Sequence, residues 1–154
     1  MNIYELEKEF EKIVGGKKND EHIEDIREKV FDLYSSSFKI IDLPSDELLA
    51  IVRSFDDKMC KEENGVKYLD KSLREMVLTV AFVTQCTDLD MKRENSGDNK
   101  EETNSDMIAA YDAIIKMWID RYFYHLDCSV WSRFTRFMYL EEEVFFDKYR
   151  YSKC

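Results

Sequence analysis

Residues 76–83, Met-Val-Leu-Thr-Val-Ala-Phe-Val, form the longest mostly apolar run of this 154-residue chain. A run that is apolar on every side suits either a buried helix or a buried strand, and its β-branched residues keep the strand alternative open. A strand needs a partner strand, and no other segment has a convincing strand pattern. We therefore expect a buried helix over residues 69–91, with a buried strand at 76–83 as the alternative.

The composition around this run also favours helices. The chain has four glycines and one proline, fewer turn residues than a sheet protein of this length needs. A hydrophobic content of 44% is ordinary for a globular protein, and 154 residues fit one domain. We expect an all-α, single-domain bundle of about six helices that spans residues 1–154.

Helical spacing of apolar residues and capping signals place the other helices. The expected segments are residues 2–14, 20–37, 45–63, 105–126 and a last helix that begins at Ser129. Asn64-Gly65 is interpreted as the stop of the third helix. Residues 92–104 are polar, contain Gly97 and have almost no apolar side chain, which predicts a loop.

The last third of the chain is rich in aromatic residues. Residues 107–154 hold 13 of the 21 Phe, Tyr and Trp residues and carry no net charge, whereas residues 1–106 carry the whole net charge of −10. At 100° per residue, the apolar arc of the helix over 105–126 contains Met107, Tyr111, Ile114, Ile115, Trp118, Tyr122 and Leu126. The apolar face of the last helix contains Val130, Phe134, Phe137, Met138, Val144 and Phe145. Because the link between these helices is short, we expect an antiparallel, aromatic-rich C-terminal helical hairpin.

The acidic balance limits the classes of partner. The longest basic clusters, Lys17-Lys18 and Lys92-Arg93, are too short to hold nucleic-acid phosphates or anionic lipids. We therefore expect no direct binding to nucleic acid or membranes. A protein partner with a basic surface is the expectation that the charge favours. The alternative is that the charge serves only solubility.

Two aromatic residues of the last helix lie outside its apolar face. Tyr139 and Phe146 are seven residues apart and have Glu142 and Glu143 between them. A contact patch for an apolar or basic partner needs this combination of rings and carboxylates. We predict that Tyr139, Glu142, Glu143 and Phe146 bind a partner. The alternatives are that another helix covers the rings or that the patch is a homodimer face.

Arg121, His125 and Glu141 are the candidates for catalysis. Arg121 and His125 are four residues apart, and Glu141 lies near the centre of the apolar face of the next helix. An Arg, a His and a carboxylate brought together can support acid–base chemistry. The segment 121–125 resembles the Arg-x4-6-His motif of HEPN-type ribonucleases, with three residues between Arg and His. The resemblance implies a small helical hydrolase or nuclease; a structural network that neutralises Glu141 is the alternative.

No motif indicates a cofactor or a metal. Cys60, Cys86, Cys128 and Cys154 are widely spaced and include no CxxC pair, so we expect reduced thiols rather than a zinc site or a disulfide framework. Residues 1–5 do not open a signal peptide, and no run is long enough to cross a bilayer, so we expect an intracellular, cytoplasmic protein.

These observations together favour a non-enzymatic, acidic interaction module. It is expected to be an inhibitor or adaptor that occupies a basic surface of a partner, including a surface that binds nucleic acid. Small viral and phage anti-defence proteins work by this physical logic. The alternative is the small hydrolase or nuclease that uses Arg121, His125 and Glu141.

Overall fold

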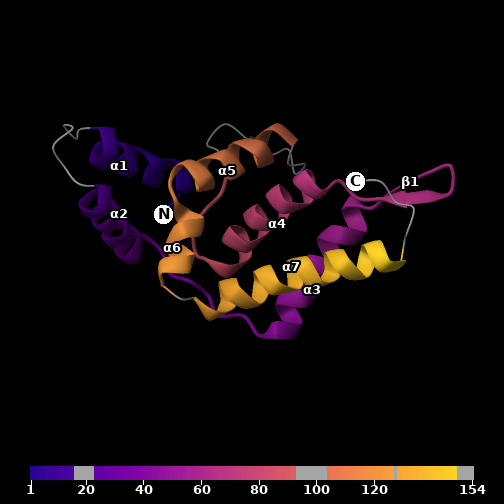
Figure 1. Ribbon diagram of the computed structural model, residues 1–154. Coiled ribbons are helices and arrows are strands. Elements are labelled where there is room, and N and C mark those ends of the chain that lie inside the picture. The colour runs from indigo at the N-terminus through magenta and orange to yellow at the C-terminus, as the bar shows by residue number, and fades with distance from the viewer. Residues whose placement is uncertain (16–22, 93–103, 127, 149–154) are drawn as a thin grey trace.

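The computed structural model describes residues 1–15, 23–92, 104–126 and 128–148 (Figure 1). These residues form seven helices and one β-hairpin. The helices are α1 (Ile3–Gly15), α2 (Ile23–Ser37), α3 (Ser45–Met59), α4 (Lys71–Cys86), α5 (Asn104–Lys116), α6 (Ile119–His125) and α7 (Ser129–Lys148). Strands β1 (Lys61–Glu63) and β2 (Val66–Tyr68) pair antiparallel. The expected all-α fold is confirmed, while residues 93–103 of the expected polar loop lie outside the described residues.

The apolar run at 76–83 lies in α4, so the helical alternative is correct. Residues 78–83 are all buried because α4 packs against α3, α5 and α7. Figure 1 shows α4 in the middle of the molecule, between α5 and α7. A helix enclosed in this way buries nearly all of its circumference, which explains why this part of its sequence has no polar face.

Aromatic rings from the C-terminal third surround α4. The fully buried ring of Phe82 lies 4.7 Å from the ring of Trp131 and 5.2 Å from that of Phe134, both on α7. It also lies 5.1 Å from the ring of Phe123 on α6. The tilted and edge-on arrangements of these rings are the favourable ones for aromatic pairs. The aromatic enrichment of the C-terminal third therefore belongs mainly to the core.

Arg74 is a charged residue in the interior, with only 2% of its surface exposed. Its guanidinium donates to both carboxylate oxygens of Asp56 on α3, at 2.6 and 3.0 Å. A third nitrogen of Arg74 lies 3.5 Å from a carboxylate oxygen of Glu142 on α7. One side chain of α4 is thus held by carboxylates of two other helices. A buried guanidinium is tolerated only with such partners, because desolvating it alone is very costly.

The third helix is shorter than expected, because α3 ends at Met59 and a β-hairpin follows. Asn64 and Gly65 both have positive φ angles, 53° and 78°. Positive φ at both central residues is the geometry of the two-residue turn that suits the twist of a hairpin, and Asn-Gly is its preferred sequence. The prediction of a helix to residue 63 was therefore wrong: the Asn-Gly pair turns a hairpin and does not stop a helix.

The single helix expected over 105–126 is divided into α5 and α6 at Met117 and Trp118. Trp118 has a φ of 59°, a left-handed conformation that a bulky residue rarely adopts. Two contacts with other helices support it: the Trp118 ring packs edge-on against Phe10 of α1 at 5.5 Å, and the Tyr34 hydroxyl of α2 donates to the carbonyl of Met117 at 2.5 Å. Ile115, which was expected on the apolar arc, is exposed.

The expected C-terminal hairpin is correspondingly smaller. Helices α6 and α7 touch through the rings of Phe123 and Trp131, at 5.3 Å. The helix that packs most extensively against α7 is α3. Leu126, at the end of α6, is exposed rather than part of a continuous apolar arc. Helix α6 has seven residues and α7 has twenty, so α6 can run alongside only part of α7.

The Arg74 network can be tested by removing its charge. In Arg74→Met, the Asp56 carboxylate, whose side chain is 18% exposed, loses its guanidinium partner. We expect the free energy of unfolding, measured with urea, to fall by about 3 kcal/mol. The matched control is Arg53→Met, which removes the exposed partner of Glu141 and is expected to cost less than about 1 kcal/mol. Equal losses in the two variants would contradict the role given to Arg74.

The buried Tyr34 predicts a loss of stability in alkali. Burial raises the pKa of Tyr34 well above its ordinary value, whereas the unfolded chain ionises this phenol near pH 10. Above that pH the unfolded state binds fewer protons than the folded state, so the stability that Tyr34 contributes falls as pH rises. The free energy of unfolding, measured with urea from pH 8 to 11, should be about 1 kcal/mol lower for Tyr34→Phe than for the wild type at pH 8. Above pH 10 it should decline less steeply with pH in the variant than in the wild type. If the free energy of unfolding declined equally steeply in both proteins, Tyr34 would not be responsible for the loss of stability in alkali.

Candidate functional site

The structure separates the three candidate catalytic residues. Arg121 and His125 are exposed on α6, where the imidazole ring of His125 packs against the ring of Phe31 at 4.8 Å. Glu141 instead accepts two hydrogen bonds from Arg53 of α3, at 3.1 and 3.2 Å. It lies twelve residues beyond Ser129, where α7 begins next to α6, which is about 18 Å along the helix. The three side chains therefore do not form one catalytic site.

The predicted partner-binding patch divides into two pairs. Glu142 lies 3.5 Å from the Lys71 ammonium and also contacts Arg74, both on α4. The Lys71 ammonium lies 4.8 Å from the centre of the Phe146 ring, a cation–π distance. Glu142 and Phe146 therefore hold α7 against α4. Tyr139, with 61% of its surface exposed, and Glu143 face solvent.

Together with Tyr139 and Glu143, three further exposed residues make up what we call the outer face of α7: Arg136, Leu140 and Val144. Val144, 58% exposed, was expected on the buried face. That expectation is wrong because Val144 borders an open cleft instead of a neighbouring helix. The sequence analysis placed Leu140 neither on the apolar face of the last helix nor in the partner-binding patch. Its exposure could not be derived from the sequence, because it depends on where α3 and α4 lie against α7.

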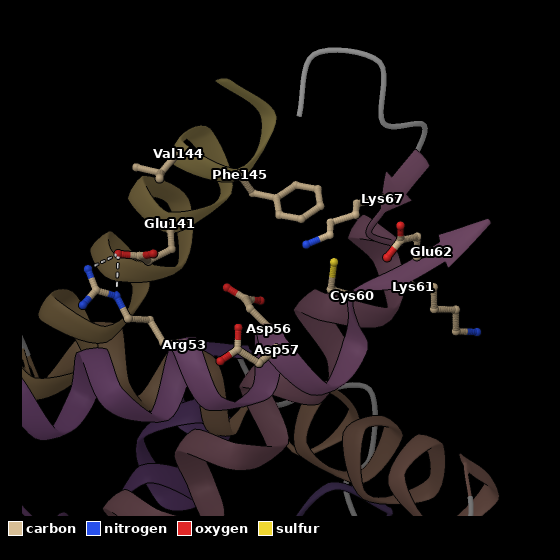
Figure 2. Close-up of a pocket in the computed structure, with 10 residues that line it drawn as sticks. All are labelled: Arg53, Asp56, Asp57, Cys60, Lys61, Glu62, Lys67, Glu141, Val144 and Phe145. Atoms are coloured by element: carbon tan, nitrogen blue, oxygen red, sulfur yellow. Dashed lines mark hydrogen bonds and ion pairs between the residues drawn. The ribbon is translucent and has the colours of Figure 1, made fainter. Parts of the chain in front are cut away.

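The cleft lies between the end of α3, the β-hairpin and the last turns of α7 (Figure 2), and its volume is about 480 Å³. Its lining residues are Arg53, Asp56, Asp57, Cys60, Lys61, Glu62, Lys67, Glu141, Val144 and Phe145. Figure 2 shows the Phe145 ring above Asp56 and Asp57 of α3. The Lys67 ammonium points into the space between the ring and these carboxylates. Four carboxylates and three cations line it. Two of the carboxylates already bind arginines, those of Asp56 and Glu141.

The sequence did not predict the cleft, because one of its walls is the β-hairpin, and the third helix was expected to extend to residue 63. Its volume suits a small molecule. Among the described residues that line it, no histidine stands beside Cys60 to activate the thiol as a nucleophile.

The acidic surface lies elsewhere, on α1 and α2. These two helices, which pack together, carry eight carboxylates and four basic side chains. Two carboxylates of α1, Glu7 and Glu11, bind the ammonium of Lys116 on α5, at 3.2 and 2.6 Å. All four carboxylates of α2 are exposed and fall within an arc of about 100° around the helix: Glu24, Asp25, Glu28 and Asp32. We call this set the α2 acidic face.

Neither a metal centre nor a membrane span is found in the part of the chain that the structure describes. There, no three His, Cys, Asp or Glu side chains cluster in a way that could hold a metal ion. No helix of these residues combines the length and the apolar character needed to cross a bilayer. Comparisons of the chain with protein families, with curated proteins and with solved structures find no match.

The division of the predicted patch can be tested by alanine substitution. We expect Tyr139→Ala to leave the free energy of unfolding within about 0.5 kcal/mol of the wild-type value, because most of its ring contacts water. Phe146→Ala should cost about 1 kcal/mol, since it removes the contact with the Lys71 ammonium and that with the Phe145 ring. Urea denaturation measures both. A larger loss for Tyr139→Ala than for Phe146→Ala would reverse the assignment of the two rings.

Proposed function

We propose that this protein is a non-enzymatic, acidic interaction module that binds a basic surface of a partner protein through the α2 acidic face. The observation that carries the proposal is the exposure of all four α2 carboxylates on one side of a helix. Such a row attracts a basic surface over a distance of about 8 Å at physiological salt and repels acidic competitors.

The spacing of the carboxylates favours a partner rich in arginine and lysine. Glu24, Glu28 and Asp32 are four residues apart along α2, so their side chains follow one another at intervals of about 6 Å. Carboxylates in a row offer charge-assisted hydrogen bonds to guanidinium and ammonium groups, as phosphates do. A partner whose basic surface holds nucleic acid is therefore the favoured class, and occupation of that surface inhibits it. This is the mode of action proposed here, by analogy with viral and phage anti-defence proteins, inside the cell.

The positions of the other candidate residues favour the α2 acidic face over catalysis on α6 and over the outer face of α7. Arg121 and His125 are on α6, whereas Glu141, the carboxylate that would complete a catalytic group, lies about 18 Å along α7 from Ser129, where that helix begins next to α6. The outer face of α7 carries one basic and one acidic residue, Arg136 and Glu143, and is therefore less suited to a basic partner than the α2 acidic face.

The experiment neutralises the α2 acidic face. The variant Glu24→Gln/Asp25→Asn/Glu28→Gln/Asp32→Asn removes four negative charges from one face. The matched control Glu47→Gln/Glu62→Gln/Glu75→Gln/Asp112→Asn removes four exposed charges spread over α3, β1, α4 and α5. Each protein is immobilised and exposed to a cell lysate at about 0.05 and 0.5 M salt. We expect the wild type and the control to retain a basic protein at low salt only, and the α2 variant to retain at least tenfold less of it.

Three results would overturn the proposal. They are equal capture by the α2 variant and the control, capture of partners without a basic surface, and capture that does not weaken at high salt. Circular dichroism and urea unfolding of all three proteins check that the α2 variant is folded, so that a loss of capture reports on the surface and not on stability.

A further inference from the structure

The outer face of α7 combines exposed apolar residues with two opposite charges. Tyr139, Leu140 and Val144 are exposed within six residues of α7, next to exposed Arg136 and Glu143. Among the described residues, no ion pair involves Arg136 or Glu143. Apolar residues gathered on the surface with charges at the margin are typical of a protein contact. The contacts inside the fold therefore give this face no structural role.

The order of these residues along α7 is self-complementary. Arg136 and Glu143 are seven residues apart, so they lie along nearly the same line of the helix, about 10.5 Å from each other. Tyr139 and Leu140 lie between them, one on each side of that line. The midpoint between Tyr139 and Leu140 is also the midpoint between Arg136 and Glu143. A helix that meets its own copy antiparallel across this midpoint therefore places each Arg136 opposite the Glu143 of the other copy.

We propose that the outer face of α7 binds the same face of a second copy of this chain, antiparallel about a two-fold axis that passes between Tyr139 and Leu140. Two Arg136–Glu143 ion pairs flank the axis, Tyr139 of each copy packs against Tyr139 of the other on one side of the contact, and Leu140 packs against Leu140 on the other side. A parallel arrangement is excluded by charge, because it sets Arg136 against Arg136 and Glu143 against Glu143. Interfaces of this kind, in which one patch contacts itself, are the rule in two-fold dimers.

The dimer is weak and leaves the α2 acidic face accessible. The contact involves a few turns of one helix, which is less than the roughly 1,200 Å² that stable complexes bury. Association is therefore expected at protein concentrations on the order of 100 µM. Figure 1 shows α2 at the end of the molecule opposite the β-hairpin, away from the last turns of α7. A dimer would thus present two acidic faces, which would raise the avidity for an extended basic partner.

Charge reversal tests the pairing directly. Sedimentation velocity from about 10 µM to 1 mM protein should show the wild type shifting from monomer to dimer. Arg136→Glu leaves only carboxylates on the face and Glu143→Arg leaves only cations, so each alone should weaken association at least tenfold.

An equimolar mixture of the two variants should associate again. The carboxylate introduced in one variant then faces the guanidinium introduced in the other, and the native Arg136–Glu143 pair forms at the opposite end of the contact. Neither misfolding nor another interface explains recovery on mixing.

The control variant is Arg121→Glu, which reverses an exposed charge on α6 and should dimerise like the wild type. The proposal is overturned if the wild type remains monomeric at about 1 mM, if the single reversals dimerise normally, or if the folded variants fail to associate on mixing. A monomeric wild type that loses capture of a lysate protein in Tyr139→Ala would assign this face to a different protein. The α2 variant should still dimerise, so failure of the basic-partner proposal and failure of this one give different results.

Discussion

The arrangement of the surface depends on one buried guanidinium. Arg74 extends from α4 to Asp56 of α3 and Glu142 of α7, and its position in the interior makes an alternative packing of these helices costly. The contacts of Glu142 with Arg74 and of Phe146 with Lys71 favour the observed rotation of α7 about its axis. That rotation decides which residues of α7 face the solvent.

The apolar core sets the shape around this network. Helix α4 is buried between other helices, and the ring of Phe82 contacts rings of both α6 and α7. The left-handed Trp118 and its contact with Phe10 allow α6 to turn away from α5 and reach those rings. The unfavourable conformation of one residue is thus offset by aromatic burial on both sides of the break.

The two surfaces proposed to bind partners differ in the physics that would drive binding. The α2 acidic face offers charge and almost no apolar area, so it favours fast, salt-sensitive association. The outer face of α7 has a balanced charge and exposed apolar side chains, so it favours contact with a face of the same composition. A protein that is acidic as a whole can therefore associate with itself, because the contact excludes the α2 acidic face.

Composition and the local spacing of side chains were sufficient to predict the helical class and the burial of residues 78–83, most of the apolar run. The placement of the candidate site residues depended on packing between distant segments: Glu141 binds Arg53 far from His125, Glu142 and Phe146 pack against α4, and Val144 is exposed. Helical periodicity assigns a residue to a side of its own helix, but the neighbour on that side comes from a distant part of the chain. The break at Trp118 had no local signal either, because its left-handed backbone is supported by contacts with α1 and α2.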